Sequence, residues 1–275
     1  MSGTSQARDL ADGFEVLRRR FLALTGIDLD GYRGAQLERR LGAFLARRGF
    51  PDVAALAVAL EADPALLEEF RNYLTINVSE FFRNPDRFEE LRNRILPELL
   101  ARSPVLRIWS AGCSIGAEIY SVAMILAELT PGRRHYLVGT DIDRPVLERA
   151  RRAVFTEQEV RLVPERLLRR FFQVGQDGAY HLDRRLAETV EFRYHNLLRD
   201  PLLADMDLIL CRNVVIYFTE EAKERLYRGF RDSLRPGGYL FLGGTEMIFN
   251  ARHLGLEPVS PCFYRKVESR EGSVR

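Results

Sequence analysis

In three places the sequence has small or polar residues directly after an apolar run. The segment "AGCSIG" follows "RIWS" closely and contains Gly112, "GTDID" ends another apolar run at Asp141, and "CRN" ends a third at Asn213. A turn without side-chain bulk lets a ligand approach the backbone, and an acidic residue about 30 positions later is typical of a carboxylate that accepts both ribose hydroxyls of an adenosine. This pattern predicts a nucleotide-type site. It does not separate nicotinamide cofactors from S-adenosylmethionine.

Each of these features also has a purely structural interpretation. A turn of small residues can serve close packing between a strand and the following helix, and Asp141 could cap a helix. Asp143 is better placed for capping, because Pro145 follows it. The "CRN" segment could be a polar strand end without a function. The functional interpretation therefore depends on a fold that brings the three strand ends to one edge of a sheet.

The elements that would position these residues are strands that alternate with helices. We expect strands at 106–110 and within "HYLVGTDID", "MDLILCRN" and "GGYLFLGG", with helices at 118–129, 145–153 and 220–234. This alternation implies right-handed crossovers and a parallel sheet with helices on both faces. The segment "AYHLDRRLAETVEFRYHNLL" predicts a small hairpin insertion followed by a sheet strand at Val190–Tyr194.

The chain before Ser79 has helical periodicity throughout. Helices are expected at 10–25, 32–48, 53–61 and 66–74. The expected domains are a helical N-terminal domain at 1–80, a linker helix at 81–104 and a sheet domain at 105–275, with a small β-subdomain at about 174–192.

The composition limits the classes of protein to consider. The chain has 275 residues, 46% of them hydrophobic, and a net charge of only +2, which does not indicate whole-molecule attraction to nucleic acid or membrane. The three cysteines are far apart and no Cys/His ligand spacing occurs, so neither a disulfide framework nor a metal site is expected. No apolar run approaches the length of a membrane span, and we expect a soluble cytoplasmic protein without membrane insertion.

Several segments, in this order along the chain, resemble the CheR-type protein-glutamate O-methyltransferases that modify bacterial chemotaxis receptors. They are "NVSEFFRNPDRFEEL", "IWSAGCSIGAEIYSVAM", "GTDIDRPVLERAR", "NLL" at Asn196, "CRNVVIYF" and "LRPGGYLFLGGTE". The "SEFFR" and "CRNVVIYF" segments are specific to the family, whereas the glycine turn and "PGG" are shared with many methyltransferases. The likeness runs from about residue 32 to 264.

The resemblance implies an α/β fold: a class I S-adenosylmethionine-dependent methyltransferase (Rossmann-like) domain with a small β-subdomain, preceded by an all-helical N-terminal domain. The chain departs from the family pattern at Ile115, Ala117 and Ile119, and Gly244 stands where the family usually has a histidine. These departures leave the details of the turn and the substrate preference open.

The resemblance also implies roles for individual residues. Asp141 would accept from the ribose, Glu118 would pair with the cofactor ammonium, and Arg83 and Tyr217 would lie at the reacting centre. Ile142 and Leu197 are candidates to cover the adenine. The expected cofactor-binding residues are Asn77, Ser79, Arg83, Ala111, Gly112, Glu118, Asp141, Ile142, Asn196, Leu197, Asn213 and Val214. Arg83 could instead form a surface ion pair, and Tyr217 could be a core tyrosine.

The implied reaction transfers the methyl group of S-adenosylmethionine to receptor glutamates, giving methyl esters for sensory adaptation and S-adenosylhomocysteine as the product. A glutamate with a pKa of about 4.3 is ionised at neutral pH, so no general base is needed. The implied partner is the cytoplasmic domain of methyl-accepting chemotaxis receptors. A monomeric cytoplasmic enzyme, recruited to membrane receptor arrays, is expected.

Two features bear on how the substrate is held. Arg33, Arg40 and Arg47 recur every seven residues and fall within about 40° of arc on a helix, which could be an ordinary solvated face. With the family likeness we interpret them as a receptor-docking stripe. The turn "VGQDGAYHL" is shorter than the glycine-rich loop of members that bind a receptor's C-terminal pentapeptide, so a tether-independent enzyme is expected.

Alternatives from other classes remain. One is a methyltransferase acting on a small molecule or on RNA, although no broad basic surface with interleaved aromatics is evident. Another is a non-catalytic relative that keeps the cofactor pocket as a sensor or docking module. An NAD-dependent dehydrogenase is a third, but the full GxGxxG fingerprint is missing.

Overall fold

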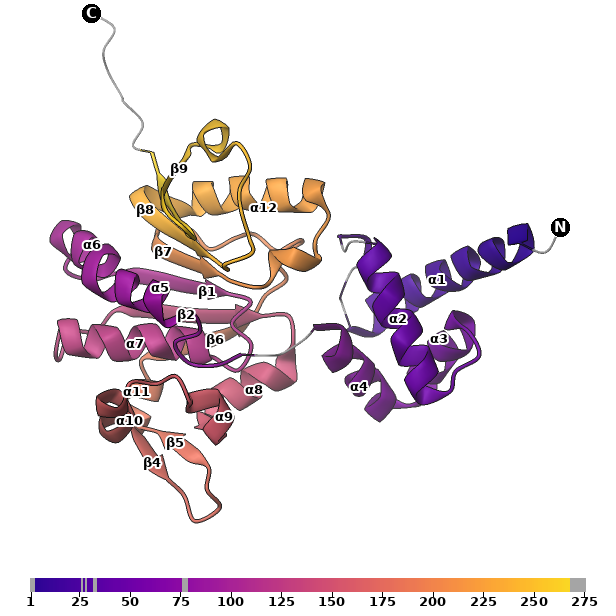
Figure 1. Cartoon of the computed structure of the whole chain (residues 1–275), viewed down its shortest axis with the longest axis horizontal. Helices are drawn as coiled ribbons and strands as arrows, with labels where there is room; N and C mark the ends of the chain where they lie inside the picture. The colour runs from indigo at the N-terminus through magenta and orange to yellow at the C-terminus, as the bar shows by residue number, and fades with distance from the viewer. Residues whose placement is uncertain (1–2, 26, 28, 32–33, 76–78, 268–275) are drawn as a thin grey trace, which may run out of the picture. The chain divides into compact units, whose positions relative to one another are not determined.

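The computed structural model describes residues 3–25, 27, 29–31, 34–75 and 79–267 (Figure 1). Two residues named above, Arg33 and Asn77, lie outside these ranges. The chain divides into two compact units: the first comprises residues 1–77 and 217–222, and the second, which contains the sheet, comprises residues 78–216 and 223–275.

The first unit is helical, as predicted. It contains α1 (Gly3–Thr25), the short 3-10 turn η1 (Leu29–Gly31), α2 (Gly34–Arg48), α3 (Val53–Ala62) and α4 (Pro64–Thr75). Its core includes Phe21, Phe44 and Phe70, which are fully buried. The ring centroid of Phe70 lies 5.4 Å from that of Phe21 and 4.8 Å from that of Phe44, so the aromatic packing ties α4 to α1 and α2.

The second unit is built on a seven-stranded sheet within the described residues. Its strands are β1 (Arg107–Ala111), β2 (Tyr136–Asp141), β6 (Val190–Tyr194), β7 (Met206–Cys211), β8 (Leu234–Leu242), β9 (Leu256–Ser260) and β10 (Phe263–Lys266). The order is β6-β2-β1-β7-β8-β10-β9. The strands from β6 to β8 are parallel, and β10 is antiparallel to both of its neighbours. The predicted parallel sheet is confirmed, including the strand at Val190–Tyr194.

Helices cover both faces of this sheet (Figure 1). The described helices from Pro85 onward are α5 (Pro85–Glu90), the π-helical turn η2 (Leu91–Ile95), α6 (Leu96–Arg102), α7 (Ala117–Leu129), α8 (Arg144–Arg152), α9 (Glu157–Val160), α10 (Glu165–Phe171), α11 (Arg184–Ala187) and α12 (Glu220–Ser233), with 3-10 turns η3 (Val215–Tyr217) and η4 (Ala251–Leu254). Of these, α9, α10 and α11 lie beside the small sheet described below (Figure 1). Successive side chains of β1 point to opposite faces of the sheet. The ring of Trp109 lies 5.6 Å from that of Phe230 on α12, whereas Ser110 bonds to Glu118 on α7.

A second, antiparallel sheet is inserted in this unit. It consists of β3 (Val154–Phe155), β4 (Phe172–Val174) and β5 (Tyr180–Leu182), in the order β3-β5-β4. The expected hairpin is present as β4 and β5, but the small sheet begins earlier than the expected 174–192. The reason is that β3 is too short to show alternation in the sequence, while Val190–Tyr194 pairs with β2 in the main sheet.

The strand order reverses at β1, which has β2 on one side and β7 on the other. Since these strands are parallel, their carboxyl ends meet at one edge, where ligands bind in open α/β sheets. Gly112, Asp141 and Asn213 follow or end these strands and therefore share that edge. The arrangement is that of the class I methyltransferase fold predicted from the sequence.

Candidate functional site

The glycine turn after β1 is fixed to the end of β2. The amides of Gly112 and Cys113 both donate to the carbonyl oxygen of Thr140, at 2.8 and 2.9 Å. Gly112 has a φ of +79°, and a Cβ at this position would lie 2.5 Å from Cγ2 of Val214. Only glycine permits this approach. The turn after β1 and the loop after β7 are therefore packed directly against each other.

Asp141 ends β2 beside this turn. Its Oδ2 accepts from the amide of Ser114 at 2.8 Å, and its Oδ1 accepts from the amide of Asp143 at 3.0 Å. Burial raises the pKa of the Asp141 carboxyl to about 6, against the lowering effect of the two amides. Above that pH the carboxylate is ionised and held in one orientation, as an acceptor for a diol requires.

Ile142 and Leu197 follow the neighbouring strands β2 and β6 and are both half-buried. Between these strand ends, the amide of His195 donates to the carbonyl oxygen of Asp141 at 3.0 Å. The buried Asn196 uses its Oδ1 to accept from the amide of Leu198 at 3.0 Å. This corner of the edge is therefore apolar, with a fixed amide group beside it.

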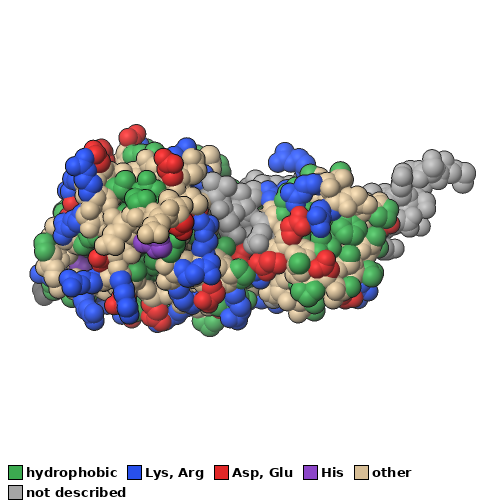
Figure 2. Space-filling model, turned by 90° about the horizontal axis from the view of Figure 1, so that it is seen from below, with side chains coloured by type: hydrophobic (Ala, Val, Ile, Leu, Met, Phe, Trp, Pro, Cys, Tyr) green, Lys and Arg blue, Asp and Glu red, His purple; other side chains and the backbone are tan. Residues whose placement is uncertain are grey.

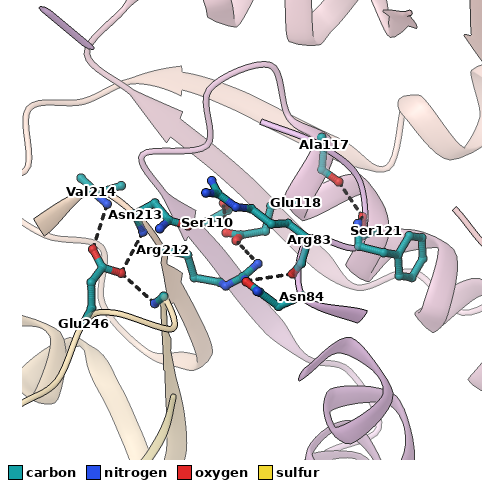
Figure 3. A network of polar contacts seen from close by, with 12 residues as sticks. Arg83, Asn84, Ser110, Ala117, Glu118, Ser121, Arg212, Asn213, Val214 and Glu246 are labelled. Carbon is teal, nitrogen blue, oxygen red and sulfur yellow. Dashed lines mark hydrogen bonds and ion pairs between the residues drawn. The ribbon is translucent and has the colours of Figure 1, made fainter. Parts of the chain in front are cut away.

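Arg212 is the centre of a polar network at the end of β7 (Figure 3). Its guanidinium donates to Oε2 of Glu118 at 3.2 Å, to the carbonyl oxygen of Arg83 at 2.8 Å and to Oδ1 of Asn84 at 2.6 Å. It also lies over the ring of Phe241, 4.6 Å from the centroid. Arg212 thus joins β7, α7 and the segment before α5.

Glu118 lies in the first turn of α7, where its carboxylate contacts two partners. Oε1 accepts from the hydroxyl of Ser110 at 2.9 Å, and Oε2 pairs with Arg212. Burial raises the pKa of Glu118, and the charge of Arg212 opposes that rise. The ion pair neutralises much of the negative charge that the sequence analysis assigned to a cofactor ammonium.

The backbone on either side of Arg83 is held in an unusual conformation. Phe82 and Asn84 both have positive φ, at 52° and 62°. The amide of Phe82 donates to the hydroxyl oxygen of Ser121 at 3.0 Å, and that hydroxyl donates to the carbonyl oxygen of Ala117 at 2.7 Å. Helix α7 and Arg212 therefore constrain the backbone that carries Arg83 (Figure 3).

Glu246, in the loop after β8, binds the loop after β7 through its carboxylate. Oε2 accepts from the amides of Asn213 and Gly243, and Oε1 accepts from the amides of Val214 and Val215, at distances of 2.7 to 3.1 Å. Burial raises the pKa of Glu246, and the four amides lower it. Glu246 in the loop after β8 thus fixes the position of Asn213 and Val214, which are expected to line the site.

The remaining predicted residues lie in β1, in the segment after β7 or in the segment that leads to Arg83. Ala111 is buried at the end of β1, and Val214 is half-buried against Gly112. Tyr217 is half-buried in η3, and Ser79 is half-buried at the start of the described second unit.

Sequence reasoning assigned no role to Arg212, Glu246 or Ser121. Arg212 stands inside the quoted "CRN" segment, so its position after a buried strand was a usable signal. Glu246 ends the "GGTE" segment, but nothing in the sequence indicates which amides it binds. Ser121 lies inside an apolar helix, where a hydroxyl commonly bonds back to the helix itself.

The three departures from the family pattern lie in the core. Ile115, Ala117 and Ile119 are at most 1% exposed. They form part of the apolar cluster around α7 and contribute no polar group to the site. Gly244 is exposed, and a Cβ there would meet nothing within 4 Å, so a larger side chain at this position would fit.

Two of the three arginines proposed for docking, Arg40 and Arg47, have partners within the first unit, whereas Arg33 lies outside the described residues. Arg40 donates to the carbonyl oxygen of Tyr73 and lies over its ring, 4.8 Å from the centroid. Arg47 lies at the same distance from that ring and bonds to Glu69 at 2.9 Å. Arg40 is half-buried, whereas Arg47 is exposed. On the face drawn in Figure 2, basic and acidic side chains are interspersed.

Among the described residues, no group of three or more His, Cys, Asp or Glu side chains could hold a metal ion. Within the same ranges, no helix combines the length and apolar character needed to cross a membrane.

The site fits an adenosylated amino acid. The glycine turn has no room for a Cβ, the Asp141 carboxylate suits a ribose diol, and half-buried apolar side chains stand beside it where an adenine would lie. Glu118 follows β1 and can still accept from an ammonium while it is paired with Arg212.

Comparison with known proteins gives the same result. The family model for the SAM-binding domain of CheR methyltransferase matches residues 77–259, and the model for the all-alpha domain of CheR methyltransferase matches residues 12–75. A chemotaxis protein methyltransferase of Listeria monocytogenes is 39% identical over 243 residues, covering 88% of this chain and 92% of that protein. Chemotaxis protein methyltransferase 2 of Pseudomonas aeruginosa is 33% identical over 261 residues, covering 92% of each.

Proposed function

Because this chain belongs to the CheR methyltransferase family, with S-adenosylmethionine as its cofactor, we propose that it methylates glutamate side chains of chemotaxis receptors. The product would be a glutamate methyl ester that adjusts receptor signalling. The observation that carries the proposal is the shared sheet edge, where Asp141, Glu118 and Arg212 meet the loop of Asn213 and Val214. The receptor glutamate as acceptor rests on the family relationship.

The cofactor would be held by residues from three strand ends. The Asp141 carboxylate accepts from the ribose, Ile142 and Leu197 cover the adenine, and Asn196 presents its amide beside them. Gly112 and Ala111 let the ligand approach the backbone. Ser79 and Asn77 are proposed at the border of the site, on the segment that leads to Arg83. Asn213 and Val214 would close it from the side of β7.

The amino-acid end of the cofactor would lie near the ion pair. Glu118 has a second lone pair on each carboxylate oxygen and can still accept from an ammonium while paired with Arg212. We therefore retain Glu118 as the ammonium partner, and we add Arg212 as the group that keeps its carboxylate oriented. A cofactor carboxylate could pair with Arg83.

The reaction needs few catalytic groups from the protein. Bound S-adenosylmethionine supplies an electrophilic methyl group on a sulfonium. The acceptor glutamate is ionised at neutral pH and can attack without a general base. Arg83 and Tyr217 are proposed to bind and align the incoming carboxylate, and the neighbouring apolar residues exclude water from it.

For the receptor itself we propose that α2 is the docking helix. Arg47, which is exposed, would meet acidic residues on the receptor's cytoplasmic helices, and Arg40 would extend the same stripe. We also propose that the enzyme needs no C-terminal pentapeptide tether, because the turn between β4 and β5 is short. Binding of a tether peptide in titration calorimetry would contradict that proposal.

The decisive experiment is transfer of labelled methyl groups to receptor-containing membranes, followed by mild base. Methyl esters release methanol, whereas N-methyl groups do not. Release of volatile label from the receptor band supports the proposal. Binding of S-adenosylhomocysteine without any transfer would instead favour a non-catalytic relative, and base-stable label would overturn glutamate as the acceptor.

A further inference from the structure

Glu246 is a buried carboxylate whose bonds all go to main-chain amides. It is 6% exposed and accepts from Asn213, Val214, Val215 and Gly243. The first three amides are consecutive in the loop after β7. The fourth comes from the strand end that carries Glu246 itself. A charged acceptor with two bonds on each oxygen makes these hydrogen bonds stronger than neutral ones.

The loop that Glu246 binds has an irregular backbone conformation. Asn213 has a φ of +60°, and Val215 begins the short turn η3 that ends at Tyr217. The first amides of such a turn have no partners within it, and the Glu246 carboxylate supplies acceptors for them. Because the side chain of Val214 also packs against Gly112, the same carboxylate sets the distance between the loops after β1 and β7.

We propose that Glu246 is a positioning residue: its ionised carboxylate holds the 213–216 loop in the one conformation that binds the cofactor. The roles of Asn213 and Val214 in this inference rest on the proposed function. Glu246 itself is placed to act through this loop and through no contact of its own with the substrate.

The charge and the two-oxygen geometry are both required. Glutamine in place of Glu246 keeps the size of the side chain but has a single acceptor oxygen, and its amide nitrogen would face two N–H donors. One pair of amides, either Asn213 and Gly243 or Val214 and Val215, would then lose its acceptor in a buried place. The loop would be expected to open rather than the whole domain to unfold, because its neighbours in β7 and β8 keep their strand pairing.

The test uses Glu246→Gln with Asp207→Asn as the matched control. Asp207 is also a buried carboxylate, 6% exposed, and it accepts from the amide of Arg107 at 2.7 Å and pairs with Arg235. It lies near the amino end of β7, whereas the Glu246 partners follow the carboxyl end of that strand. Both substitutions neutralise a buried carboxylate that receives main-chain bonds, so both should lower the melting temperature.

The readouts are the Kd for S-adenosylhomocysteine by calorimetry and amide hydrogen exchange of the 213–216 segment. Glu246→Gln should raise the Kd by about tenfold and accelerate exchange in that segment, whereas Asp207→Asn should leave both near wild type. Glu246→Asp, which keeps the charge on a shorter side chain, should give an intermediate Kd, and it serves as the test if the glutamine variant does not fold.

Unchanged Kd and unchanged exchange in Glu246→Gln would overturn the proposal. Equal losses in the Asp207→Asn control would also overturn it, because they would show that any buried carboxylate has this effect. Neither readout needs a methyl acceptor. If the wild-type chain fails to methylate receptors, the proposed function fails, while the comparison of Kd and exchange remains valid.

Discussion

Nη1 of Arg212 lies 3.2 Å from Oε2 of Glu118, and this ion pair joins the loop after β7 to the first turn of α7. The Arg212 side chain is 3% exposed and that of Glu118 is 15% exposed, so both charges are largely removed from water. Burial of such a pair is favourable only when each charge keeps its partner. The pair therefore makes the stability of the sheet edge depend on two residues of the site.

Replacement of Arg212 by leucine should lower the free energy of unfolding by about 3 kcal/mol, because it leaves the Glu118 carboxylate buried without its partner. The double variant Arg212→Leu/Glu118→Gln should lose less than the sum of the single changes. Urea unfolding followed by circular dichroism measures all three. Arg228→Leu is the control, since Arg228 pairs with Glu224 while both are more than half exposed. That variant should change stability by less than about 0.5 kcal/mol. Additive losses in the double variant would contradict the role of the pair.

The pH dependence of cofactor binding should follow Asp141. Its pKa is raised to about 6, so the carboxylate is ionised at pH 7.5 and becomes protonated as the pH falls through 6. The Kd for S-adenosylhomocysteine should therefore rise by up to about tenfold per pH unit below 6. Asp141→Asn should bind weakly at every pH and lose this dependence. Asp177→Asn, at an exposed position in the β4–β5 turn, should keep it.

Protonation of Asp141 should weaken cofactor binding, but it should stabilise the folded state. Because its pKa in the folded chain lies above the usual 3.8, the folded state binds the proton more tightly than the unfolded state. The contribution of this group to stability is therefore greatest below about pH 4 and is lost as the pH rises through 6. The difference in unfolding free energy between wild type and Asp141→Asn, measured from pH 5 to 7.5, isolates this contribution. A difference that does not vary with pH would refute the raised pKa.

The sequence predicted which strand ends form the site, but it did not predict the contacts between the side chains there. Strand periodicity and strand ends are local properties, so Gly112, Asp141 and Asn213 could be placed at one edge from the pattern alone. The partner of Glu118 could not, because Arg212 is 94 positions away and the pair exists only when β1 and β7 are neighbours. Glu246 is a similar case: its bonds cross from β8 to the loop after β7.

The small sheet shows the same limit. Its strand β3 has only the residues Val154–Phe155, and pairing with β5 rather than a sequence pattern defines it. The family likeness supplied the presence of this subdomain but not its first strand. Likewise, the positive φ of Phe82 could not be predicted, because its amide donates to Ser121, 39 positions away. Asparagine adopts positive φ more readily, but the sequence does not indicate that Asn84 accepts from Arg212.

Ser121→Ala should impair catalysis more than cofactor binding. The substitution removes the buried acceptor of the Phe82 amide, which costs about 1–3 kcal/mol and lets the backbone around Arg83 relax. We expect kcat for receptor methylation to fall while the Kd for S-adenosylhomocysteine changes little. Thr130→Val is the control at the opposite end of α7, because it removes a hydroxyl that donates to Leu126 without touching Phe82. Equal changes in kcat for the two variants would argue against a link from Ser121 to Arg83.

Charge reversal of Arg47 tests the docking stripe without disturbing the methyltransferase unit. The side chain of Arg47 is 50% exposed, whereas Arg40 is half-buried on Tyr73, so Arg47→Glu separates docking from folding better than a change at Arg40. An acidic receptor helix should be repelled, and kcat/KM for receptor methylation should fall roughly fivefold at low salt. The effect should shrink at about 0.15 M salt, where the screening length is about 8 Å. Arg169→Glu, exposed on α10, is the control for net charge and should leave kcat/KM near wild type. If Arg47→Glu and Arg169→Glu reduce methylation equally, the receptor responds to overall charge and α2 is not its docking helix.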